Sequence, residues 1–339
     1  WRDSVLRTRS HSSVESPNSR AMSAELSGSP GKFAGVLIAT PGAAGAIGTA
    51  GLAVAGLGGS TAQAQTVIPD QEKLWTNSNT GRRVAIINDA LLQIGPPLAI
   101  ELAKAGHDLV LAQPKEGLVE KLEGLGSKVV VIEGVEQEGP NDETNPEHAK
   151  KLVDAAIKNF GGFDSAYFRT ALHGGADILN VTKEQLQKSF ESNFVAVVSA
   201  LQAVLPPLMK AGRGQVVILT SASAVRGPYD FIPYVPMRVA ANNLIQCAAM
   251  TAAEKGVCVN AFGTNYLNYP DAVKSYGGEE AMAHVASKLP VGRFGEPEEA
   301  AHLAMALLDG KNMFTTGQTI MIAGGYNSRM DDLKFTKWQ

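Results

Sequence analysis

The sequence has few of the residues that build metal centres, disulfides or nucleic-acid surfaces. Cys247 and Cys258 are the only cysteines, and because both lie in apolar stretches we interpret them as buried, reduced thiols. The six histidines are dispersed, and no cysteine or histidine pair has the spacing of zinc ligands. Lysine and arginine are scattered, without a basic stripe interleaved with aromatic residues. We therefore predict no metal site and no nucleic-acid partner.

The first 80 residues differ from the rest of the 339-residue chain. A serine- and arginine-rich start is followed by an uncharged apolar run from Phe33 to Gly58 and then by Ala62-Gln63-Ala64. This order is typical of an export or organelle targeting signal, with cleavage near Ala64. A disordered leader on a cytoplasmic protein is the alternative. Because glycine and proline interrupt the run, we predict no stable membrane span.

From residue 83 the chain alternates between short apolar runs and helical stretches. The runs predict strands at 83–88, 108–112, 128–133, 165–168, 215–220, 257–261 and 319–322, with long helices at 183–211 and 234–254. Buried strands that alternate with helices indicate an α/β fold. We predict a single Rossmann-like, doubly wound parallel sheet over residues 81–327, with helices on both faces, followed by a tail at 328–339. Ligands of such sheets bind beyond the carboxyl ends of the strands.

Three polar residues have a distinctive spacing at one of these strand ends. Twelve residues separate Ser221 from Tyr234, and three more separate Tyr234 from Arg238. Over about residues 82–326 the chain resembles the short-chain dehydrogenase/reductase superfamily, with arginine in place of the usual lysine. The resemblance implies catalytic roles for these three residues and for Asn193, which occupies the position of the family's active-site asparagine.

The positions that hold the nucleotide in that superfamily are changed. The family's Thr-Gly-x-x-x-Gly-x-Gly is replaced at residues 88–95, where only the last glycine remains. Asp89 adds a like charge and Gln93 adds bulk where a pyrophosphate would lie. Gln113 stands where an acidic residue would hold the ribose, and Phe-Arg-Thr-Ala at 168–171 replaces Asn-Asn-Ala-Gly. We therefore predict that the protein uses no cofactor.

One branch of the superfamily, the halohydrin dehalogenases, lacks the nucleotide and uses Ser-x(12)-Tyr-x(3)-Arg, the motif found here. Residues 264–267 resemble the halide-site loop of that branch. The resemblance implies that substrate and halide contact Gln93, Thr264, Asn265, Tyr266 and Leu267, and Tyr229 lies where the superfamily lines its substrate pocket. The implied ligands are a small-molecule substrate and a halide or other small anion.

The chemistry of a cofactor-independent lyase follows from these residues. A guanidinium favours the tyrosinate form of a nearby tyrosine, so Tyr234 can remove the proton of a vicinal hydroxyl while Ser221 hydrogen-bonds the same oxygen. The resulting alkoxide displaces the leaving group and closes an epoxide, and in reverse an anion opens the epoxide. We predict this activity, a halohydrin dehalogenase-like lyase.

Two other functions stay open. One is an NAD(P)-dependent short-chain oxidoreductase with a degenerate glycine loop, and the other is a non-catalytic scaffold or subunit of a complex that retains the fold. The helices predicted at 183–211 and 234–254 are apolar around most of their circumference. Such helices need a second partner, so we predict a homodimer or homotetramer.

Overall fold

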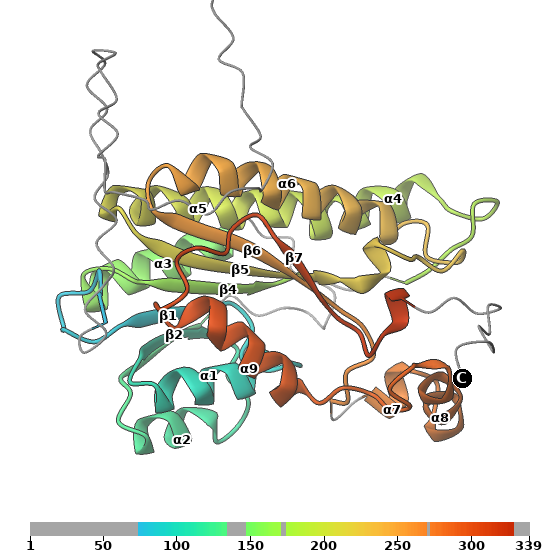
Figure 1. The fold of residues 1–339 in the computed structure, drawn as a ribbon, viewed down its shortest axis with the longest axis horizontal. Coiled ribbons are helices and arrows are strands. Elements are labelled where there is room, and N and C mark those ends of the chain that lie inside the picture. Colours follow the sequence, from blue (N-terminus) through green and yellow to red (C-terminus); the bar gives the residue numbers. More distant parts are fainter. Residues whose placement is uncertain (1–73, 134–146, 171–173, 270–271, 329–339) are drawn as a thin grey trace, which may run out of the picture. The chain divides into compact units, whose positions relative to one another are not determined.

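The computed structural model describes residues 74–133, 147–170, 174–269 and 272–328 (Figure 1). The predicted targeting leader, its cleavage near Ala64 and the tail from residue 329 lie outside the described residues.

Seven parallel strands form one sheet in the order β3-β2-β1-β4-β5-β6-β7. They are β1 (Val84–Ile87), β2 (Asp108–Ala112), β3 (Val129–Ile132), β4 (Ser165–Arg169), β5 (Gly214–Ser221), β6 (Val257–Thr264) and β7 (Thr319–Ile322). Strand order reverses between β1 and β4, which are hydrogen-bonded neighbours. Such a reversal opens a crevice at the carboxyl ends of the strands. The predicted doubly wound parallel sheet is confirmed.

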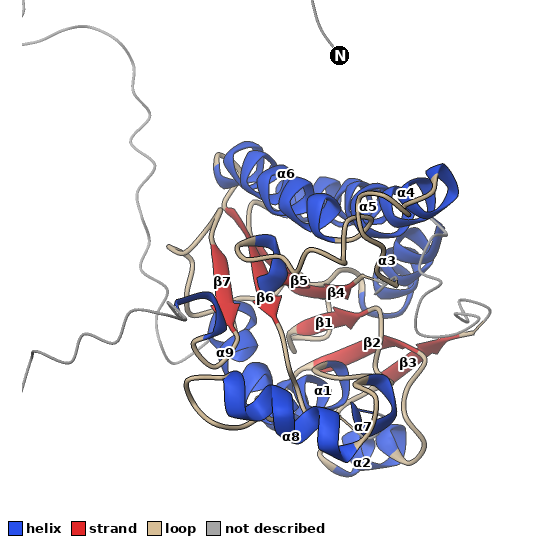
Figure 2. Cartoon of the chain, turned by 90° about the vertical axis from the view of Figure 1, so that its right-hand side faces the viewer, coloured by secondary structure: helices blue, strands red, loops and turns tan. Residues whose placement is uncertain are grey.

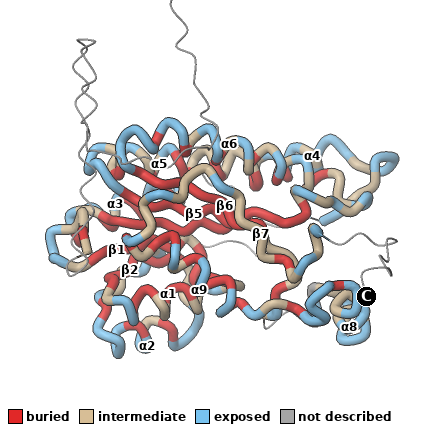
Figure 3. Tube along the Cα trace, viewed as in Figure 1, coloured by how far each residue is buried: buried red, intermediate tan, exposed pale blue. Residues whose placement is uncertain are grey.

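Helices cover both faces of the sheet (Figures 1 and 2). One face carries α3 (Glu147–Phe160), α5 (Ala196–Ala211) and α6 (Val235–Ala253), and the other carries α1 (Gly95–Lys104), α2 (Leu118–Gly124) and α9 (Pro297–Leu308). Successive strand residues point to opposite faces, so Ile86 packs in the first layer and Ile87 in the second. Both layers leave the outer surfaces of the helices exposed (Figure 3). The central strands are buried on both sides, which explains their continuous apolar sequence.

The remaining elements are short. They are α4 (Lys183–Phe190), the π-helix η1 (Glu191–Val195), the 3-10 helices η2 (Ala222–Ala224) and η3 (Tyr326–Ser328), α7 (Ala272–Ser275) and α8 (Glu279–Lys288). The helix predicted at 183–211 is thus three consecutive pieces, α4, η1 and α5. Within the described residues, this run is the one that is long and apolar enough to cross a membrane, judged by length and composition. Its side chains Val197, Leu201 and Val204 pack against the sheet.

Strands β5 and β6 are longer than predicted, and their register positions the site. Each extends to a polar residue because the two strands stay paired, with Thr220 opposite Gly263 and Ser221 opposite Thr264. Their carboxyl ends therefore lie side by side. Of the two cysteines, Cys258 is buried, as predicted, whereas Cys247 is exposed because it lies on the outward side of α6.

The described structure begins before residue 81. Trp75 is buried, and its indole Nε1 donates a hydrogen bond of 2.9 Å to the Gly310 carbonyl. The Arg83 guanidinium lies 4.0 Å from the centre of the Trp75 ring, and its Nε donates to His107 Nε2 at 3.0 Å. These contacts join the segment before β1 to the residues that follow α9.

Candidate active site

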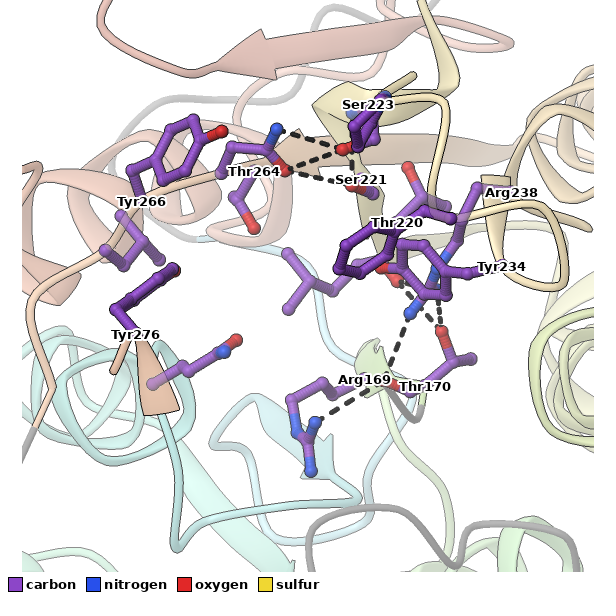
Figure 4. Close-up of a pocket in the computed structure, with 16 residues that line it drawn as sticks. Arg169, Thr170, Thr220, Ser221, Ser223, Tyr234, Arg238, Thr264, Tyr266 and Tyr276 are labelled. Carbon is purple, nitrogen blue, oxygen red and sulfur yellow. Dashed lines mark hydrogen bonds between the residues drawn. The ribbon is translucent and has the colours of Figure 1, made fainter. Parts of the chain in front are cut away.

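A cavity of about 240 Å³ opens beyond the carboxyl ends of β4, β5 and β6 (Figure 4). Residues from all three strand ends line it, namely Arg169, Ser221 and Thr264. Among the residues predicted from the sequence, those that line this cavity are Gln93, Ser221, Tyr234, Arg238, Thr264, Asn265, Tyr266 and Leu267. The parallel topology brings together residues that are more than 170 positions apart, because the carboxyl ends of parallel strands share one edge.

Ser221 is the last residue of β5 and is almost fully buried. Its hydroxyl donates a hydrogen bond of 3.0 Å to Asn265 Oδ1 and accepts one of 3.1 Å from the Ser223 backbone N–H. The Asn265 amide nitrogen in turn donates to Ser223 Oγ at 3.1 Å. Asn265 therefore sets the direction of the Ser221 hydroxyl. Ser223 lines the cavity too, and sequence reasoning did not single it out.

Tyr234 and Arg238 form the opposite part of the site. Tyr234 immediately precedes α6 and Arg238 lies one turn later, so that the guanidinium carbon is 4.7 Å from the centre of the Tyr234 ring. Both side chains are buried. Arg238 Nη1 donates to Thr170 Oγ1 and, at 3.4 Å, to the Leu219 carbonyl. Thr170, just after β4, and Leu219, in β5, therefore anchor a positive charge next to the phenol ring.

Two predicted site residues do not line the cavity. Asn193 is buried within η1, where its amide nitrogen donates 3.1 Å hydrogen bonds to the Ser189 carbonyl and Ser192 Oγ. Its Oδ1 has no hydrogen-bond partner among the described residues. Tyr229 is 83% exposed, because the loop before α6 turns it outward and places Phe231 against the cavity instead. The Phe231 ring packs edge-on against Tyr234, 6.3 Å away.

The loop between β1 and α1 differs most from expectation. Asp89 is fully buried, and its Oδ2 lies 2.5 Å from Arg169 Nε in a salt bridge whose two side chains are 1% and 4% exposed. The other carboxylate oxygen accepts hydrogen bonds from the Leu91 and Leu92 backbone N–H groups at 2.9 and 3.0 Å. Asn88 also exchanges two hydrogen bonds with the Arg169 backbone. The negative charge predicted in this loop is present, and Arg169 neutralises it.

The same loop keeps the backbone form that glycines would give it. Gln93 stands where the family has its second glycine, and it adopts a left-handed φ of 48°. Gly95 remains because a Cβ there would lie 1.8 Å from the Asp89 carbonyl oxygen. Gly95 is the first residue of α1, and the next two, Pro96 and Pro97, have no N–H to offer an anion.

Tyrosines form the far wall of the cavity. Tyr266 and Tyr276 line it (Figure 4). The Tyr266 ring also packs against that of Tyr326, with ring centres 5.4 Å apart. Burial raises the pKa of Tyr266 to about 12 and also raises the pKa of Tyr276 well above its ordinary value. Both phenols therefore stay neutral at physiological pH. They offer aromatic surface and hydroxyl hydrogen bonds rather than a base.

The fold and site define an α/β protein with a serine, a tyrosine and an arginine at the carboxyl edge of a doubly wound sheet. Residues 92–327 match the family model described as enoyl-(acyl carrier protein) reductase. The chain belongs to the short-chain dehydrogenase/reductase superfamily, as its sequence resemblance predicted.

Individual relatives agree with this assignment. The chain is 26% identical over 259 residues to a cyclohexanol dehydrogenase of Acinetobacter sp. (strain SE19), covering 76% of this chain and all of that protein. It is 26% identical to a 7alpha-hydroxysteroid dehydrogenase of Escherichia coli (strain K12), covering 72% and 93% of the two chains. Its fold is similar to that of a levodione reductase, with a TM-score of 0.65, 20% identity and coverage of 73% and 98%.

These comparisons overturn two predictions. The prediction of a halohydrin dehalogenase-like lyase is wrong, because the family model describes a reductase and the curated relatives are dehydrogenases. The prediction of no cofactor is wrong with it, since such enzymes use nicotinamide nucleotides and a similar fold, with a TM-score of 0.64, is described as ElxO with NADP bound. The motif Ser-x(12)-Tyr-x(3)-Arg misled because it records only the geometry of a strand end and one helical turn. That geometry serves proton transfer with or without a hydride.

Proposed function

We propose that the protein is an NAD(P)-dependent short-chain oxidoreductase that interconverts a small secondary alcohol and the corresponding ketone. The observation that carries the proposal is the buried stack of Arg238 on Tyr234 in the cavity that also holds Ser221. The names of the relatives support the substrate class, because cyclohexanol and 7alpha-hydroxysteroid dehydrogenases act on ring alcohols. An aromatic wall of Phe231, Tyr266 and Tyr276 suits such a mostly apolar ring.

The residues of the chain have distinct roles in this reaction. Tyr234 exchanges the proton of the substrate oxygen, and the charge of Arg238 stabilises the tyrosinate that results. The Ser221 hydroxyl turns from Asn265 to the same oxygen and stabilises the charge that develops there. A nicotinamide, when bound, supplies or accepts the hydride. The β1–α1 loop and Arg169, which lines the cavity, are the groups that would hold the nucleotide phosphates.

The test is nucleotide-dependent oxidation of a panel of cyclic secondary alcohols, followed as the appearance of NADH or NADPH. We expect activity with the wild-type protein and a loss of at least about 10²-fold in kcat for Tyr234→Phe, because the proton acceptor is removed. Nucleotide affinity should not change in this variant. A wild-type protein that oxidises no alcohol and reduces no ketone with either nucleotide would contradict the proposal.

We also propose that the protein is a homodimer or homotetramer that associates through the outer side of α6. Val239, Cys247 and Met250 share that side at helical spacing and are exposed. An apolar stripe on an outward helix surface supports a second copy as its cover.

A further inference from the structure

The Asp89–Arg169 salt bridge lies inside the candidate active site rather than beside it. Asp89 follows β1 and Arg169 ends β4, the two strands between which the strand order reverses. Arg169 also lines the cavity that holds Ser221 and Tyr234 (Figure 4). Ligands of doubly wound sheets bind at this reversal point, so the ion pair lies where a ligand would be expected to bind.

The Asp89 carboxylate has the surroundings that a bound phosphate would have. Two consecutive backbone N–H groups, of Leu91 and Leu92, and the Arg169 guanidinium all donate to it. Backbone N–H groups of a loop that precedes a helix, joined by an arginine, form a common anion site. In the protein without ligand, the Asp89 carboxylate fills this anion site.

The buried charges of Asp89 and Arg169 each compensate the other. A lone aspartate here would repel a diphosphate, and a lone arginine would be a charge buried without compensation. Together they leave the loop neutral, with side chains that are 1% and 4% exposed. The first turn of α1 contains Pro96 and Pro97 and so contributes fewer N–H donors than an ordinary helix start. A diphosphate bound here therefore needs another donor. Arg169 lines the cavity and is the arginine whose guanidinium already contacts this loop, through Asp89.

We propose that Arg169 binds the diphosphate of the nucleotide cofactor, and that Asp89 is the counter-ion that holds this guanidinium until the nucleotide arrives. The inference rests on the proposed function. It makes Asp89 a competitor of the cofactor, so that removing the aspartate charge strengthens nucleotide binding while removing the arginine weakens it. A purely structural ion pair would give no such opposite effects.

The experiment is titration of the full-length protein with NADPH and with NADH, followed by nucleotide fluorescence and without substrate. Asp89→Asn keeps an acceptor for the two N–H groups, and we expect its Kd to fall by at least about tenfold. Arg169→Gln should raise the Kd by at least about tenfold, and Asp89→Asn/Arg169→Gln should lose the gain of the single variant. Arg169→Lys should recover part of the loss, because it keeps the charge without the planar fork. Arg213→Gln, next to the amino end of β5 at the opposite edge of the sheet, is the matched control and should leave the Kd unchanged.

The outcomes separate this inference from the proposed function. If the wild-type protein binds nucleotide but Asp89→Asn and Arg169→Gln change the Kd equally or leave it unchanged, the inference is overturned and the proposed function stands. If Asp89→Asn binds nucleotide but the wild-type protein does not, the proposed function fails for the native chain and the inference fails with it. If no variant binds either nucleotide, both fail. Circular dichroism of each variant establishes that it is folded, and Asp89→Gly serves as a second removal of the charge.

Discussion

Arg238 is held in a way that a lysine could imitate only in part. Its guanidinium donates to Thr170 and Leu219 while its central carbon lies over the Tyr234 ring. An ammonium is a compact charge with three donors, and it lacks the flat face that stacks on an aromatic ring. The charge and the anchoring are therefore separable contributions at this position.

A pair of substitutions separates them. We expect Arg238→Lys to keep activity within about tenfold of wild type, since the charge next to Tyr234 remains, and Arg238→Met to lose at least about 10²-fold. Both variants should melt at lower temperature, because each removes hydrogen bonds from Thr170 and Leu219. Alcohol oxidation and thermal unfolding, measured on the same samples, give the two readouts. Equal activity losses in both variants would show that anchoring, and not charge, is the contribution that matters.

The alternation of strands and helices in the sequence predicts most of the fold. Which side chains meet across the sheet cannot be predicted from the sequence. The strands β2 and β7 were predicted with their observed bounds, because a glutamine borders each apolar run, Gln113 after β2 and Gln318 before β7. Asp89 and Arg169 appeared as two separate departures from a family pattern, since they are 80 positions apart in the sequence. Only the pairing of β1 with β4 makes them neighbours. Tyr229 was misplaced for a related reason, because loop side chains have no periodicity that tells which of them faces inward.

His107, which immediately precedes β2, is buried away from the candidate active site. It accepts a hydrogen bond from Arg83 Nε through Nε2, and its Nδ1 lies 3.1 Å from the Leu102 carbonyl, so the neutral ring with a proton on Nδ1 fits both contacts. Burial and the nearby Arg83 charge lower the pKa of His107 from 6.5 to about 3. Burial raises the pKa of Asp164, which also faces Arg83.

The pKa of His107 predicts how stability depends on pH. Because the folded pKa lies below the unfolded one, the unfolded chain binds a proton between pH 6.5 and 3 that the folded chain does not bind. The contribution of His107 to stability is therefore complete above pH 6.5, and below that pH the free energy of unfolding falls by about 1.4 kcal/mol per pH unit. In His107→Gln, whose amide retains a donor and an acceptor, this loss should be absent. Urea unfolding at pH 7 and pH 5 checks it, since wild type should lose about 2 kcal/mol more than the variant. Parallel losses would contradict the prediction, and Asp164 contributes equally to both proteins.

At the scale of the whole molecule, the proposed association predicts a clear change in mass. Val239 and Met250 are 48% and 66% exposed on the outer side of α6. We expect the wild-type protein to be a dimer or tetramer by light scattering at micromolar concentration, and Val239→Glu/Met250→Glu to be smaller, because burying two carboxylates in a contact is costly. Lys150→Glu, an exposed change on α3, is the matched control. A monomeric wild-type protein would remove the proposal.

The fluorescence of Trp75 can report whether the sheet domain is folded. Its indole touches Arg83 before β1 and Gly310 after α9, so it is enclosed only when both ends of the sheet domain are in place. The other two tryptophans, Trp1 and Trp338, lie outside the described residues. Replacing these two by phenylalanine leaves a protein whose tryptophan emission comes from one buried site. Its emission wavelength then reports the integrity of the domain directly, and nucleotide titrations can be corrected for unfolding in the same cuvette.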